Sequence, residues 1–272
     1  MIVDVLLPSA LFLVGVVVVF LYSQLDKKVE RLVGGQELHL KHALLLVLTI
    51  GTMATVILAI PEQALLGLFL FAYTAILFLF TFLFVPKWYF AFLLPVLFLL
   101  SFFYWWNIYS FNFFAVIFGI FVAVYMGRLF TWKTTVAFAS LVTVMDIIQV
   151  LITGYMGKAF ETAKALGLPA FIKLPMFPTS GLTYLGLGDL FLFGLLSIQS
   201  TRKYGRCFGF MSIVVMSVVY LLLQTVLLNY YPLTNGFPAT VLVISGWLVA
   251  LAAKHLFRSF ALKKQATPKQ DS

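Results

Sequence analysis

Residues 134–153 read TTVAFASLVTVMDIIQVLIT, an apolar segment whose interior holds one charged residue, Asp146. About 20 such residues form a helix long enough to cross a bilayer. The apolar segment 181–200 holds Asp189 in the same way. No Lys, Arg or His lies at a similar depth in either segment, so a buried salt bridge does not explain the two acids. A carboxylate in hydrocarbon is costly, and each aspartate is therefore a candidate functional residue.

The composition of the whole chain indicates a polytopic membrane protein. Of its 272 residues, 63% are hydrophobic and only 10% are charged, which is far from the composition of soluble domains. We predict an all-α membrane protein in which a single domain, 1–272, forms a bundle of nine transmembrane helices. The predicted spans are 4–24, 43–60, 64–85, 88–106, 109–126, 134–153, 181–200, 207–228 and 237–256.

The distribution of basic residues predicts the orientation of the chain. Fifteen of the 18 Lys and Arg residues fall on one side of the predicted spans, and only Lys158, Lys164 and Lys173 fall on the other. Because cytoplasmic loops are enriched in Lys and Arg, we expect a cell-membrane protein with an external N-terminus and a cytoplasmic tail, 257–272. The same clustering explains the net charge of +9, so no nucleic-acid partner is expected.

The connection 154–180 is the longest between predicted spans, and we expect it on the external side. Its first part, GKAFETAKAL at 157–166, has the pattern of a short amphipathic helix at the membrane interface. The remainder contains Pro169, Pro175 and Pro178, so we expect extended or irregular chain there. The one cysteine and the three histidines do not have metal-ligand spacing, and we predict no metal and no cofactor.

The predicted topology places the two aspartates at similar depth. Asp146 lies about 7 residues, or roughly 10 Å, from the outer end of its span, and Asp189 lies about 8 residues from the outer end of the next. Gly186 and Gly188 would let these antiparallel helices approach each other closely. The same glycines would loosen the backbone just before Asp189. We therefore expect the two carboxylates to face each other.

Two facing carboxylates carry a specific chemistry. Like charges in close contact share one proton, which is the ground state of an aspartic protease. The ionised group acts as a base on water, while its protonated partner polarises a carbonyl. Thr143 and Gln149, three residues either side of Asp146, would form a polar stripe that holds such water. The sequence does not assign separate roles to the two acids, because such a pair titrates as a unit.

Three features together resemble a known family. The chain has LGLGD at 185–189, an aspartate in the preceding span, and Pro238-Ala239 at the head of the ninth predicted span. This combination is similar to the presenilin and signal peptide peptidase family of intramembrane aspartyl proteases, which are of the GxGD type. The topology resembles the family over the whole chain, and the sequence resembles it over about 140–245. The short loops resemble those of a microbial, archaeal homologue.

The resemblance implies roles for particular residues. Asp146 and Asp189 would be the catalytic pair, with no cofactor. The family motifs would supply active-site support from Gly186, Leu187 and Gly188, and substrate contacts from Pro238, Ala239 and Thr240. Two positions depart from the family pattern: Met145 stands where a Tyr is usual, and Thr240 where a Leu is usual. The first removes a hydroxyl near the pair, and the second alters how substrate packs beside it.

We therefore predict an intramembrane aspartyl endopeptidase that acts on transmembrane segments, such as signal peptides or type II membrane proteins. Its partners would be these substrates and the lipid bilayer, and the sequence does not predict an oligomeric state. The alternative is a proton- or cation-coupled transporter that uses the two acids as an ion site. Transporters often repeat such sites in both halves of the chain, whereas both acids here lie in the second half. Prepilin peptidases, also of GxGD type, would need a Lys where Phe191 stands.

Overall fold

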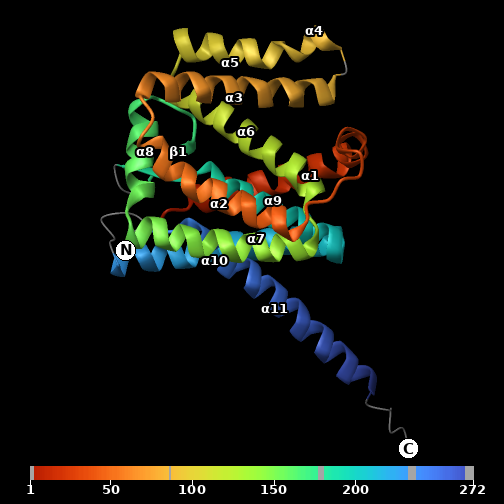
Figure 1. Ribbon diagram of the computed structural model, residues 1–272. Helices are drawn as coiled ribbons and strands as arrows, with labels where there is room; N and C mark the ends of the chain where they lie inside the picture. Colours follow the sequence, from red (N-terminus) through yellow and green to blue (C-terminus); the bar gives the residue numbers. More distant parts are fainter. Residues whose placement is uncertain (1–2, 86, 177–180, 232–236, 267–272) are drawn as a thin grey trace, which may run out of the picture.

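A computed structural model describes residues 3–85, 87–176, 181–231 and 237–266, and these residues are mostly helical, with one β-hairpin (Figure 1). In chain order the elements are α1 (Leu6–Val33), α2 (Leu40–Ile57), α3 (Glu62–Phe84), α4 (Trp88–Ala91), α5 (Leu93–Tyr104), α6 (Ile108–Leu129), α7 (Trp132–Ile147), the π-helical turn η1 (Ile148–Ile152), α8 (Tyr155–Ala165), β1 (Phe171–Pro175), β2 (Leu182–Gly186), α9 (Leu187–Tyr204), α10 (Arg206–Tyr230) and α11 (Ala239–Ala266). Residues 177–180 of the predicted external connection and 267–272 of the predicted tail lie outside the described residues.

Seven helices in the described part of the chain are long and apolar enough to cross a membrane: α1, α2, α3, α6, α7 with η1, α10 and α11. The chain is therefore an all-α, multi-pass membrane protein, as predicted. The predicted number of nine spans is not confirmed. Some helices also run past the predicted limits, α1 to Val33 and α11 to Ala266, because hydropathy marks apolar residues whereas a helix can continue into polar sequence.

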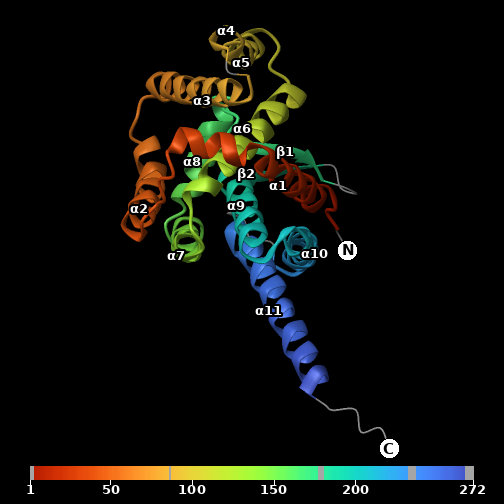
Figure 2. The same cartoon turned by 90° about the vertical axis from the view of Figure 1, so that its right-hand side faces the viewer.

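The fourth predicted span, 88–106, consists of two short helices, α4 and α5. The break at Phe92 lies where a kink is expected, because Pro95 has no N–H to donate to the carbonyl of Ala91. Together with α3 these helices form one side of the molecule (Figures 1 and 2). Buried rings join this side to α6, where the Tyr73 hydroxyl donates to the Phe114 carbonyl at 2.6 Å.

The seventh predicted span, 181–200, is not helical throughout. Leu182–Gly186 form strand β2, and α9 begins only at Leu187. β2 pairs with β1 in antiparallel fashion, with Phe171 opposite Gly186 and Pro175 opposite Leu182. The expected amphipathic helix at 157–166 is confirmed as α8, and the expected extended chain after it includes β1. The pairing of the two strands was not predicted.

Helix α9 lies in the middle of the bundle, where it packs against α1, α6, α7, α10 and α11 (Figure 2). Residues 192–200 are all buried. Small residues allow α6 to approach closely, since a Cβ at Gly127 would lie only 2.6 Å from the Ile198 Cδ1 atom. A helix surrounded by other helices does not need an apolar surface toward lipid. This position explains why α9 can end in the polar sequence QSTRKY.

Helix α11 begins beside α7, α9 and α10 and then extends away from the rest of the molecule toward the C-terminus (Figure 1). Its crossing with α10 is close, because a Cβ at Gly246 would lie 2.7 Å from the Met216 Cα atom. The start of α11 is therefore fixed against the helices that carry the two candidate acids.

Candidate active site

Asp146 lies near the end of α7, just before the chain continues as the π-helical turn η1. Its carboxylate is partly exposed and points to the start of α11. The Thr240 hydroxyl donates a hydrogen bond to Asp146 Oδ2 at 2.6 Å. A residue of α11 thus supplies a hydrogen-bond donor to one candidate acid.

Asp189 is the third residue of α9 and is also partly exposed. Its position at the start of the helix follows from the local sequence, because the strand β2 ends at Gly186 and the helix begins with the next residue. A Cβ at Gly186 would lie 3.0 Å from Asp189 Oδ2, closer than side-chain contacts normally come. The first glycine of the GxGD sequence therefore leaves the space that the carboxylate occupies.

The structure brings the two acids together. Helices α7 and α9 pack against each other, and the two acids are close enough for the charge of Asp146 to influence Asp189. No hydrogen-bond donor to Asp189 is found among the described residues. Both acid side chains are partly exposed. The acids lie at the end of the bundle that also carries α8 and the β-hairpin (Figure 1).

A narrow apolar groove runs beside the GxGD sequence. Its volume is about 180 Å³, and it is lined by Phe118, Gly119, Val122, Leu187, Gly188 and Phe191. Gly188 is exposed, and a Cβ there would meet no atom within 4 Å. Leu187 and Gly188 thus border open space next to Asp189. The groove is open to an apolar chain that approaches from between α6 and α9.

The three residues at the start of α11 differ in their surroundings. Pro238 and Thr240 are buried, and Ala239 is half-buried. The resemblance implies that all three contact substrate, but the Thr240 hydroxyl is already bonded to Asp146. This hydroxyl is therefore part of the aspartate's own environment in the structure.

One expectation about the surroundings of Asp146 is wrong. Thr143 and Gln149 do not form a water-holding stripe, because Thr143 donates to the Ala139 carbonyl and Gln149 donates across to the Gly51 carbonyl of α2. Met145 also faces α2, since a Cβ at Gly51 would collide with its side chain. The polar groups beside Asp146 on α7 thus bond to neighbouring backbone rather than to water.

The expected role of the two motif glycines in helix packing is also wrong. Gly188 has no close neighbour, and the close neighbour of Gly186 is Asp189 of its own segment. Close approach to α9 is made instead by α6, through Gly119 and Gly127. The motif glycines serve the carboxylate and the groove, whereas the α6 glycines serve packing.

Sequence reasoning missed three polar residues near this end of the bundle. Asp4 is buried, with 1% of its surface exposed, and accepts a hydrogen bond from Gln224 on α10 at 3.1 Å. Asn112 on α6 bonds both the N–H and the C=O of Lys173 in β1. Asn112 and Gln224 are isolated polar residues within apolar helices. This isolation could have marked them in the sequence as residues with a partner inside the bundle.

The hairpin packs on α8 and α6 through aromatic rings. Tyr184 of β2 contacts the rings of Phe160 and Phe171. The Lys173 ammonium lies 3.7 Å from the centre of the Phe111 ring. Partial burial lowers the pKa of Lys173, and the nearby charge of Lys164 lowers it further. These contacts fix the strand that leads into Asp189.

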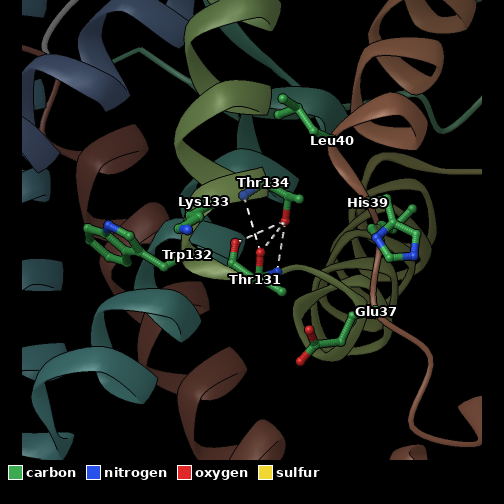
Figure 3. Close-up of a pocket in the computed structure, with 8 residues that line it drawn as sticks. Glu37, His39, Leu40, Thr131, Trp132, Lys133 and Thr134 are labelled. Atoms are coloured by element: carbon green, nitrogen blue, oxygen red, sulfur yellow. Dashed lines mark hydrogen bonds between the residues drawn. The ribbon is translucent and has the colours of Figure 1, made fainter.

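A cavity larger than the apolar groove lies elsewhere in the molecule. Its volume is about 520 Å³, and its lining comes from the chain before α2 and from the start of α7 (Figure 3). The residues are Glu37, Leu38, His39, Leu40, Thr131, Trp132, Lys133 and Thr134. The Thr131 and Thr134 hydroxyls are 3.0 Å apart and bond each other as the cap of α7. Asp146 is about four turns along α7, or roughly 20 Å away, so this cavity is not part of the candidate site.

No protein-family model matches the chain, and no curated protein sequence matches it. The site is therefore interpreted from its own residues. In the described part of the chain, no group of three or more His, Cys, Asp or Glu side chains is placed to hold a metal ion. What the site does contain is a pair of acids, a hydroxyl donor from α11 and a neighbouring strand, and these define the chemistry considered next.

Proposed function

We propose that this protein is an intramembrane aspartyl endopeptidase of the presenilin and signal peptide peptidase class, with nine membrane-crossing segments. The observation that carries the proposal is the juxtaposition of Asp146 and Asp189, on neighbouring helices α7 and α9 of an apolar bundle. A pair of neighbouring carboxylates that shares one proton is the arrangement that activates water for peptide hydrolysis.

The reaction follows from the two protonation states of the pair. The ionised carboxylate takes a proton from a water molecule, whose oxygen attacks the carbonyl carbon of the substrate. The protonated carboxylate gives its proton to the carbonyl oxygen, which yields a tetrahedral diol. The peptide nitrogen then accepts a proton from the first acid, the C–N bond breaks, and a diol proton returns to the second acid. The pair ends in its starting state.

The β-hairpin supports a mode of substrate binding. The Asn112 side chain occupies the outer edge of β1 at Lys173, with hydrogen bonds of 2.6 and 2.8 Å. Along an antiparallel pair of strands, opposite residues alternate between those that exchange backbone hydrogen bonds with each other and those whose N–H and C=O groups point away from the partner strand. Tyr184, opposite Lys173, therefore directs its N–H and C=O away from β1. An unwound substrate strand is proposed to pair with this outer edge of β2, just before Asp189.

The orientation belongs to the proposal as well. The asymmetric distribution of Lys and Arg supports an external N-terminus, a cytoplasmic C-terminus and a position in the cell membrane. The two acids then lie nearer the external face. Substrates are proposed to be transmembrane segments with a cytoplasmic N-terminus, as in signal peptides and type II membrane proteins.

The test is cleavage of a transmembrane peptide by the purified protein in lipid vesicles. Asp146→Asn and Asp189→Asn are each expected to abolish cleavage, because one acid alone cannot provide both the base and the acid. Asp4→Asn is the matched control, since Asp4 is a buried carboxylate outside the pair, and its cleavage rate is expected to stay near that of the wild type. Residual cleavage in either of the first two variants would contradict the proposed pair.

The same vesicles distinguish the alternative function. A transporter that uses the two acids as an ion site would show proton or cation flux that depends on Asp146 and Asp189, with no cleavage by the wild type. Cleavage without flux supports the protease.

A further inference from the structure

Thr240 holds Asp146 by a short hydrogen bond. The hydroxyl oxygen is 2.6 Å from Asp146 Oδ2, and the residue is 6% exposed, so bulk water does not compete for the bond. Thr240 is the second residue of α11, so the start of this helix places the hydroxyl against the Asp146 carboxylate.

The two acids consequently have different surroundings. Asp146 receives a hydrogen bond from the Thr240 hydroxyl, whereas Asp189 receives none within the described residues. Asp189 does lie in the first turn of α9, where a negative charge is favoured. A short hydrogen bond directed at a carboxylate stabilises its charge more than a helix end does. The asymmetry therefore favours a proton on Asp189 and a charge on Asp146.

We propose that Thr240 is a positioning residue that fixes Asp146 as the base of the pair and leaves Asp189 as its acid. This inference rests on the proposed protease function and assigns separate roles that the sequence left open. With Oδ2 held by Thr240, Oδ1 of Asp146 is the oxygen that takes the proton of the attacking water. Asp189 gives its proton to the substrate carbonyl oxygen, and Asp146 later protonates the leaving nitrogen.

The titratable groups around Asp146 make this proposal testable by pH. Asp189 faces it from α9. The titratable side chains described on α2 and α11 lie at the other ends of these helices, near residues 41–42 and 254–255. A base must be ionised to work, so its protonation gives the acid limb of the pH–rate profile. Loss of a donor destabilises the ionised form, and this limb then moves to higher pH.

The experiment compares Thr240→Val with Thr240→Ser in the peptide-cleavage assay. Val has the shape of Thr without its hydroxyl, so kcat should fall about 10-fold or more while KM changes less than about threefold. The acid limb should move to higher pH. Ser keeps the hydroxyl and should restore most of kcat. Thr135→Val is the matched control, because Thr135 is fully buried and its hydroxyl bonds only the Thr131 carbonyl of α7.

Other outcomes have distinct meanings. An unchanged kcat in Thr240→Val, with melting temperature near that of the wild type, overturns the positioning role alone. A rise in KM without a fall in kcat makes Thr240 a substrate-binding residue instead. If the basic limb of the pH–rate profile moves in Thr240→Val, Thr240 acts on the acid of the pair rather than on its base. If the wild-type protein does not cleave peptides, the proposed protease function is overturned. The positioning role of Thr240 is then overturned as well, because it depends on that function.

Discussion

The space beside Asp189 depends on a residue that has no side chain. At Gly186 an added Cβ would lie 3.0 Å from Asp189 Oδ2, so the carboxylate would have to move by a few tenths of an ångström. Gly188 has a different role, since it borders the open groove between α6 and α9. Two glycines separated by one residue thus meet two separate requirements of the same site.

We therefore expect Gly186→Ala to lower kcat by roughly 10- to 100-fold, because a small displacement of a reacting group has a large effect on rate. The measurement is peptide cleavage by the purified variant, alongside its melting temperature. Gly67→Ala is the control, since Gly67 lies in α3 with no atom within 4 Å of the added methyl. Full activity in Gly186→Ala would show that Asp189 does not need its observed position.

At the scale of the elements, the hairpin has one edge occupied and one edge open. Asn112 binds the main chain of Lys173 on the outer edge of β1, and β1 binds the inner edge of β2. Pro175 fits this arrangement, because it lies opposite Leu182 at a position where its missing N–H is not needed for pairing. Within the described residues, the Tyr184 N–H has no partner, which leaves it for an added strand.

The open edge predicts a contrast between two substitutions at one position. Tyr184→Pro removes the outward N–H and leaves the β1–β2 hydrogen bonds, whereas Tyr184→Val keeps the N–H and loses only the ring. If substrate pairs with β2, kcat/KM for Tyr184→Pro should be about fivefold below that for Tyr184→Val, as expected for one hydrogen bond. Steady-state cleavage in vesicles measures both. Equal values would mean that the substrate binds elsewhere.

At the scale of the whole molecule, the candidate site has a fixed orientation relative to the helix bundle. The strand β2 runs in one sense into Asp189, and an added strand must pass both acids in a fixed order. The acids lie at the end of the bundle that carries α8 and the hairpin, and the proposed topology makes that end external. The orientation of the scaffold in the membrane therefore sets the orientation of the substrate.

We expect faster cleavage of a transmembrane segment whose N-terminus is cytoplasmic than of the same segment inserted in the opposite direction. The reason is that β2 and the two acids accept the strand in one sense only. The test is to reconstitute the protein with matched substrates in both orientations and compare initial rates. Equal rates, or a preference for the reverse orientation, would refute the proposed direction while leaving the catalytic pair unaffected.

The helices of the bundle follow from local sequence. In lipid, backbone N–H and C=O groups must bond within the chain, so long apolar segments become helices wherever they occur. The same local reasoning located α8 by its amphipathic pattern. It also singled out Asp146 and Asp189, because a charge in an apolar segment is conspicuous without any knowledge of the fold.

Tertiary structure decided which of these groups meet. The bond from Thr240 to Asp146 joins residues 94 positions apart, and that from Gln149 to Gly51 joins residues 98 positions apart. Hydropathy and periodicity describe one helix at a time, whereas such bonds depend on how each helix is rotated and how closely it packs on its neighbours. For the same reason the first residues of the seventh predicted span became a strand, since their partner is β1 and not the adjacent residues of the chain.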